Sequence, residues 1–234
     1  AISARGEIAD KRLVRTFSYI GGRWVGAASG AAIRVTDPAT GAVLGEVASL
    51  SSTESATAVD AAQAAFRPWA GLLPQDRSAI LRRWFDLILA HGEDLARIMV
   101  LEQGKPLSEA RGEITYGAAF VEFYAEEARR PNIESVTSHL PDAEVELWRE
   151  PVGVAALITP WNFPSAMLTR KSAAAMAAGC TVVCHPSAET PFSALALAEL
   201  AERAGVPPGV FNVVTGEAPA VVKPWTEDVR VRAL

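Results

Sequence analysis

Residues 152–214 decide the fold, and they read VGVAALITPWNFPSAMLTRKSAAAMAAGCTVVCHPSAETPFSALALAELAERAGVPPGVFNVV. Apolar runs of strand length alternate here with longer stretches whose apolar residues recur at helical spacing. The expected strands are 152–158, 180–184 and 210–214, and the expected helices are 164–178 and 191–204. Both helices are expected to start at a proline, which the first helical turn tolerates. Continuous apolar strands alternating with helices predict an α/β fold whose parallel sheet is covered on both faces, as in an incomplete Rossmann-like sheet.

The residues before this region predict β-hairpins followed by long helices. Two hairpins are expected, at 17–25 with a Gly21-Gly22 turn and at 33–47 around the turn 37–41. Three helical stretches follow, at 56–66 behind a Ser51–Glu54 capping box, at 75–101 with a break near His91-Gly92, and at 107–129, ended by Pro131. Residues 143–148 alternate weakly and predict an exposed strand.

Composition narrows the class of protein. Of 234 residues, 50% are hydrophobic and 21% are charged, which is typical of a globular domain. The net charge of −5 argues against a nucleic-acid partner. The longest apolar runs are far shorter than the roughly 20 residues that cross a bilayer, so no membrane partner is expected. Residues 1–16 lack the apolar core and cleavage site of a secretory signal, which predicts a cytoplasmic location.

The two cysteines, Cys180 and Cys184, lie in a β-branched run that predicts a buried strand. Four residues along a strand separate their Cα atoms by roughly 13 Å, too far for a disulfide. A metal site with His185 would require a helix here, which the β-branched residues oppose. Both cysteines are therefore expected to be small apolar core residues.

The loop Thr159-Pro160-Trp161-Asn162-Phe163-Pro164 follows the first strand of the predicted parallel sheet. Ligands of such sheets bind at the carboxyl ends of the strands. Because each proline restricts its own backbone and that of the preceding residue, the Asn162 amide is held in a stiff loop. Such a fixed neutral donor suits an oxyanion site. The alternative is that Asn162 caps the helix that follows.

These loop residues, together with the segments 101–107, 191–200 and 204–216, resemble the aldehyde dehydrogenase superfamily, and most closely its succinate-semialdehyde branch. The resemblance extends over residues 17–234. It implies NAD- or NADP-dependent oxidation of succinate semialdehyde, or of a similar semialdehyde such as glutarate semialdehyde, through attack by a cysteine thiolate. Asn162 would then stabilise the oxyanion as a catalytic residue.

The same resemblance assigns a substrate residue and a cofactor site. Arg170 would bind the distal carboxylate of the substrate through its guanidinium fork, unless it is only a solvated charge on its helix. The family usually has lysine at position 185 and glutamate or serine at position 188, where this chain has His185 and Ala188. Neither a fixed cation nor a carboxylate is present, so the choice between NAD and NADP stays open. Glu189 is expected either near the ribose or as a cap of the next helix, and Gly216 either beside the adenine or simply in a turn. The residues implied in cofactor binding are Ile158, Thr159, Pro160, Trp161, His185, Ser187, Ala188 and Gly216.

By this resemblance the chain divides into three parts. Residues 1–136 form the N-terminal helical part of the cofactor-binding domain, 137–151 an oligomerisation-arm strand, and 152–234 a truncated Rossmann-like dinucleotide-binding region. A homo-oligomer, dimer or tetramer, is expected. The nucleophilic cysteine, the glutamate base and the pyrophosphate loop of the family are expected beyond residue 234, so these 234 residues are expected to be inactive alone. The alternative is a non-catalytic binding or assembly module.

Overall fold

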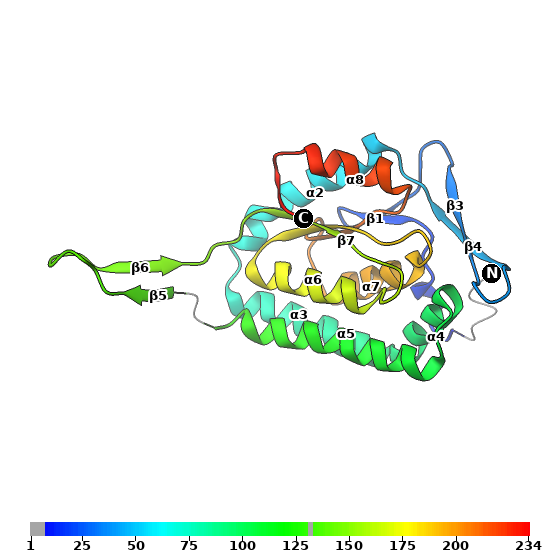
Figure 1. Ribbon diagram of the computed structural model, residues 1–234, viewed down its shortest axis with the longest axis horizontal. Coiled ribbons are helices and arrows are strands. Elements are labelled where there is room, and N and C mark those ends of the chain that lie inside the picture. Colours follow the sequence, from blue (N-terminus) through cyan, green and yellow to red (C-terminus); the bar gives the residue numbers. More distant parts are fainter. Residues whose placement is uncertain (1–7, 131–132) are drawn as a thin grey trace.

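The computed structural model describes residues 8–130 and 133–234. An α/β core built on a six-stranded sheet lies beside long helices, and the β-hairpin of β5 and β6 extends from one end as a thin arm (Figure 1). The elements, in chain order, are η1 (Lys11–Leu13), β1 (Ser18–Ile20), β2 (Arg23–Val25), β3 (Ala32–Thr36), β4 (Val43–Ala48), α2 (Ser52–Ala70), α3 (Pro74–Ala90), α4 (Gly92–Gln103), α5 (Leu107–Glu127), β5 (Ile133–Val136), β6 (Val145–Trp148), β7 (Val154–Ile158), α6 (Ala166–Ala178), β8 (Thr181–His185), α7 (Pro191–Arg203), β9 (Phe211–Val213), α8 (Ala218–Glu227) and β10 (Val231–Ala233).

The main sheet contains strands from both the N-terminal and the C-terminal regions of the chain. Its strand order is β10-β7-β8-β9-β1-β2. Strands β10, β7, β8 and β9 are parallel, whereas the hairpin β1–β2 adds antiparallel to β9. The expected α/β fold with a parallel sheet and N-terminal hairpins is confirmed.

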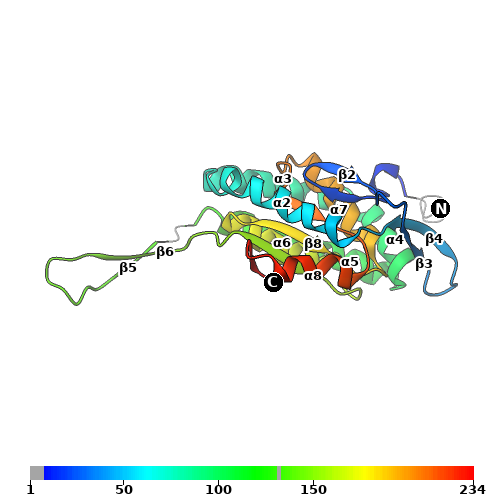
Figure 2. The same ribbon diagram turned by 90° about the horizontal axis from the view of Figure 1, so that it is seen from above.

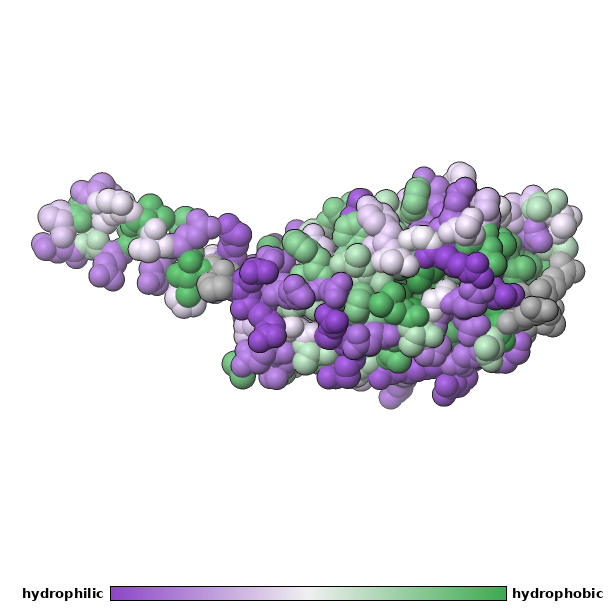
Figure 3. Space-filling model, turned by 90° about the horizontal axis from the view of Figure 1, so that it is seen from below, coloured by the Kyte–Doolittle hydropathy of each residue, from purple (hydrophilic) through white to green (hydrophobic). Residues whose placement is uncertain are grey.

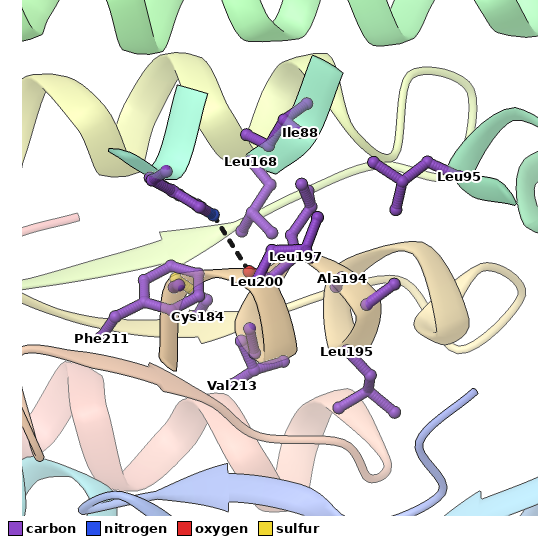
Figure 4. Packing of buried hydrophobic residues seen from close by; sticks show 14 of the residues in the cluster. Ile88, Leu95, Leu168, Cys184, Ala194, Leu195, Leu197, Leu200, Phe211 and Val213 are labelled. Carbon is purple, nitrogen blue, oxygen red and sulfur yellow. Dashed lines mark hydrogen bonds between the residues drawn. The ribbon is translucent and has the colours of Figure 1, made fainter. Parts of the chain in front are cut away.

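Helices cover both faces of this sheet, which explains its continuous apolar strands. Val154 and Ala156 of β7 point into a cluster with Trp225 of α8 and with residues of α2. The alternating Ala155 and Leu157 point into the larger cluster on the opposite face, where α3, α5, α6 and α7 pack. Figure 4 shows part of this larger cluster, with side chains of α6, α7, β8 and β9 in contact.

Local signals explain most helix boundaries. The Ser51–Glu54 capping box is present before α2, and the predicted break at His91-Gly92 separates α3 from α4. Helix α7 begins at Pro191 as expected, but α6 begins at Ala166, so placing Pro164 in the first turn was wrong. Helix α5 ends at Glu127, and its predicted terminator Pro131 lies outside the described residues.

The arm is an antiparallel hairpin of β5 and β6, and every residue of these two strands is exposed. It extends well away from the body in two perpendicular views (Figures 1 and 2). Apolar and charged residues are mixed along it (Figure 3). Strand β6 matches the expected exposed strand, whereas its partner β5 was not predicted. Among the described helices, none has the length and apolar character needed to cross a membrane.

Candidate active site

Three loops meet at the carboxyl edge of the parallel strands, after β7, β8 and β9. Ile158 and His185 are register partners at the ends of β7 and β8. The Thr159 amide donates to the His185 carbonyl at 3.1 Å, and the Val214 amide donates to the Cys184 carbonyl at 2.8 Å. The residues predicted for the cofactor, at 158–161, 185, 187, 188 and 216, therefore lie at strand ends or in the loops that follow them along one sheet edge, where ligands of parallel sheets bind.

The loop after β7 presents Asn162 at the surface. Trp161, Asn162 and Phe163 are exposed, whereas Ser165, at the start of α6, is buried. No side chain of this loop caps α6. The first-turn amides of Ser165 and Ala166 donate instead to Glu113 Oε1 of α5, at 3.0 and 3.2 Å. The capping interpretation of Asn162 was therefore wrong, because a carboxylate from another helix occupies that position.

Two lysines bind the backbone of this same loop. Lys105 Nζ donates to the Asn162 carbonyl at 3.0 Å and lies 2.5 Å from Glu113 Oε2. Lys171 Nζ donates to the Ile158 carbonyl at 2.8 Å. Neither lysine was predicted to have a role, although Lys105 lies within the family-like segment 101–107. Its position in that segment was the only available signal.

The loop after β8 places His185 inward. The residue is 4% exposed, its Nδ1 lies 3.0 Å from the Val214 carbonyl, and its ring packs edge-on against Trp225. Burial lowers the pKa of His185, so the imidazole is neutral near pH 7. This position therefore offers no cation to a phosphate.

The neighbouring polar side chains are partly engaged with one another. The Ser187 hydroxyl donates to the Glu189 carboxylate. Glu189 does not cap α7, because the Phe192 and Ser193 amides donate to Glu102 of α4 at 2.8 and 2.7 Å. Glu189 is exposed, and Ser187 is bonded to only one of its carboxylate oxygens.

Gly216, after β9, is buried and has φ +156°. A Cβ built there would lie 2.7 Å from Val221 Cγ2 and 3.0 Å from the Leu50 carbonyl oxygen. The packing of the chain itself thus requires glycine at this position. Contact of Gly216 with an adenine stays a prediction.

The sequence profile of the aldehyde dehydrogenase family matches residues 24–234. The chain belongs to the aldehyde dehydrogenase family. The resemblance inferred from the residues around Asn162 is therefore confirmed over most of the sequence.

Relatives of this aldehyde dehydrogenase chain include semialdehyde dehydrogenases. It is 54% identical to a non-phosphorylating aspartate-semialdehyde dehydrogenase of Halomonas elongata, over 97% of this chain and 46% of the relative. It is 52% identical to the NADP(+) succinate-semialdehyde dehydrogenase of Escherichia coli, over 96% of this chain and 47% of the relative. The crystal structure of an E. coli NADP-dependent enzyme matches with a TM-score of 0.95 and 52% identity, over 96% of this chain and 47% of that one. The chain spans about half the length of the relatives it matches.

Arg170 of this aldehyde dehydrogenase chain lies on the exposed side of α6. Its guanidinium contacts Met167 Sδ at 3.2 Å and lies 5.9 Å from the ring centroid of Phe120 on α5. Within residues 8–130 and 133–234, no carboxylate forms an ion pair with Arg170. The guanidinium is therefore available to an anionic ligand.

The two cysteines of the chain are free and buried, as expected. Cys184 lies in β8, and Cys180 directly precedes that strand instead of lying within it. Burial raises the pKa of the Cys184 thiol, which keeps it protonated. Neither thiol is therefore placed to attack an aldehyde.

Proposed function

We propose that this chain provides the oxyanion donor and part of the dinucleotide site for the NAD- or NADP-dependent oxidation of a semialdehyde to its carboxylic acid, with succinate semialdehyde as the substrate. The observation that carries the proposal is the placement of Asn162. This residue is exposed at the carboxyl edge of a parallel sheet, between two prolines, with the capping of α6 done by Glu113.

The residues along this edge fit a nicotinamide dinucleotide. Ile158 and Trp161, 39% and 53% exposed, offer apolar surface to a flat ring. The Glu189 carboxylate offers an acceptor to sugar hydroxyls. The neutral His185 and the absence of a carboxylate at Ala188 favour neither cofactor, so both NAD and NADP belong in the test. When bound, the cofactor would accept hydride from the substrate carbon.

The chemistry assigned to this chain is charge stabilisation and substrate orientation. Attack of a thiolate on an aldehyde places negative charge on the carbonyl oxygen, and the Asn162 side-chain amide would donate a hydrogen bond to that oxygen. The Arg170 guanidinium would pair with the distal carboxylate of the substrate and so select acidic aldehydes. Since both cysteines here are buried, the thiolate would come from elsewhere in the enzyme.

Steady-state kinetics of the full-length protein with NAD and NADP tests the role of Asn162. Asn162→Ala is expected to lower kcat by about 10²-fold or more, because one oxyanion donor is lost. Asn212→Ser, which changes a buried asparagine distant from this loop in the chain, is the comparison for general damage. An Asn162→Ala enzyme with wild-type kcat would exclude the oxyanion role.

The role of Arg170 is tested by comparing two substrates. Arg170→Ala is expected to raise KM for succinate semialdehyde strongly while leaving KM for an uncharged aldehyde of similar length nearly unchanged. An equal rise in KM for both substrates would show that Arg170 does not bind the distal carboxylate.

We further propose that the 234 residues alone have no dehydrogenase turnover, because neither buried cysteine can act as the nucleophile. Purified chain is expected to form no NADH or NADPH on addition of aldehyde. Turnover by this sample would refute the proposal.

The arm supports a second proposal, self-association into a homo-oligomer. An isolated two-stranded hairpin is only marginally stable in water. In this one, Leu147 and Trp148 are 53% and 63% exposed, and burying them against a second copy of the chain would stabilise the arm. Light scattering coupled to gel filtration is expected to show a dimer or tetramer that Leu147→Glu dissociates. A wild-type monomer would contradict this role and favour an arm without an assembly function.

A further inference from the structure

The start of α6 is held by an ion pair that lies outside that helix. Lys105 follows α4, and Glu113 lies in the second turn of α5. Their charged atoms, Nζ and Oε2, are 2.5 Å apart, and their side chains are only 10% and 1% exposed. A buried pair of this kind requires further hydrogen bonds to offset the loss of hydration.

Those further bonds all go to the loop that carries Asn162. Glu113 Oε1 accepts from the Ser165 and Ala166 amides at 3.0 and 3.2 Å. Lys105 Nζ donates to the Asn162 carbonyl at 3.0 Å, and the same ammonium lies 4.4 Å from the Phe163 ring centroid. One ion pair therefore binds the loop in its middle, at Asn162, and at its junction with α6.

We propose that Lys105 and Glu113 are positioning residues, which fix the backbone of residues 162–166 so that the Asn162 amide stays at the sheet edge. The inference rests on the proposed function only for its catalytic consequence. The mechanical consequence, an immobile Asn162 backbone, can be measured without any turnover.

A second buried carboxylate provides a matched control. Glu102 caps α7 in the same manner, with bonds of 2.8 and 2.7 Å to the Phe192 and Ser193 amides. It has no lysine partner among the described residues and no hydrogen bond to the Asn162 loop. Glu102→Gln therefore removes an equivalent helix cap while leaving the Lys105–Glu113 pair intact.

The chain is well suited to a selective NMR measurement, because it contains only three asparagines, at positions 132, 162 and 212. In protein labelled with ¹⁵N-asparagine, the backbone amide of Asn162 reports on the loop. Asn212 reports on the core, since its side chain is buried and bonded to the Val182 and Gly209 carbonyls. Loss of one signal in Asn162→Asp assigns the spectrum.

We expect Lys105→Met and Glu113→Gln to lower the heteronuclear NOE of Asn162 on the picosecond to nanosecond timescale, with Asn212 unchanged. Lys105→Arg should restore the Asn162 value, because a guanidinium can make both contacts. Glu102→Gln should leave Asn162 rigid. If Lys105→Met also disturbs Asn212, the double variant Lys105→Met/Glu113→Gln, which removes both charges together, decides between mobility and unfolding. A rigid Asn162 in the folded single or double variants would overturn the inference.

In the full-length protein the same variants separate positioning from catalysis. Lys105→Met is expected to lower kcat on the order of 10- to 100-fold with little change in KM, and Lys105→Arg to recover most of it. If the wild-type protein oxidises no aldehyde, the proposed function fails, while the NMR result still decides whether the ion pair holds the loop. If Asn162 becomes mobile and kcat does not change, the catalytic consequence is refuted.

Discussion

Replacing Glu102 with glutamine tests how a fully buried carboxylate behaves at a helix start. Glu102 accepts hydrogen bonds from the first turn of α7 on both of its oxygens. Burial has the largest influence and raises the pKa of Glu102 from its ordinary 4.5 to about 8, while the hydrogen bonds from Ser193 and Phe192 act in the opposite direction. Glutamine has nearly the same shape and does not titrate. It keeps only one of the two acceptor oxygens, but that loss is the same at every pH, so the pH dependence of the stability difference isolates this one ionisation.

The direction in which stability changes with pH depends on whether the folded or the unfolded state binds the Glu102 proton more tightly. With a raised pKa, the folded state retains the Glu102 proton at pH values where the unfolded state has lost it. The resulting stability is fully present below about pH 4.5 and is lost as the pH rises towards about 8. The loss is at most about 1.4 kcal/mol per pH unit, so the wild type should lose up to about 3 kcal/mol relative to Glu102→Gln between pH 5 and pH 7.

Urea unfolding followed by tryptophan fluorescence, at one-unit steps from pH 5 to pH 8, measures this difference. All other ionisable groups are common to both proteins and cancel in the comparison. The reasoning would be refuted if the free energy of unfolding of the wild type increased relative to that of Glu102→Gln as the pH rises. It would show that the helix amides outweigh burial and keep the carboxylate ionised.

Three further predictions concern backbone geometry and thiol access. Gly209→Ala should destabilise the chain by at least about 1 kcal/mol, because φ is +84° and the new Cβ would lie 2.5 Å from the Ala61 carbonyl oxygen. Gly41, with φ +69°, has nothing within 4 Å of its Cβ position, so Gly41→Ala should lower the free energy of unfolding by less in the same urea experiment. Ser51→Ala should cost about 1 kcal/mol through loss of the α2 capping box, and an unchanged unfolding midpoint would contradict this. Neither cysteine should react with iodoacetamide in the folded chain, and both should react in urea, as mass spectrometry can show.

Much of the fold was predictable because its signals are local. Parallel strands buried on both faces leave continuous apolar runs, which is why β7, β8 and β9 could be found from residues 152–214. The elements that were missed have weak local signals. Strand β5 is exposed at every position, β10 has only three residues, and α8 contains two prolines.

The site was only partly predictable for a related reason. The loop residues around Asn162 follow a predicted strand, so topology alone places them at the sheet edge. The groups that hold the loop are distant in sequence: Glu113 reaches an amide 52 residues away. Glu102 reaches an amide 90 residues away. Hydrophobic periodicity carries no information about such contacts, so a local capping role stayed open as the alternative for Asn162.

The direction of these two caps has a consequence for synthesis of the chain. Glu102 and Glu113 leave the ribosome before α7 and α6, the helices whose first turns they complete. The nascent α4–α5 segment thus already carries the acceptors when each later helix emerges, and that helix can dock as it is made. In a protein permuted to begin with residues 152–234, α6 and α7 would be synthesised before Glu102 and Glu113. The first turns of both helices would then lack their acceptors during synthesis, which should slow folding and favour aggregation during translation.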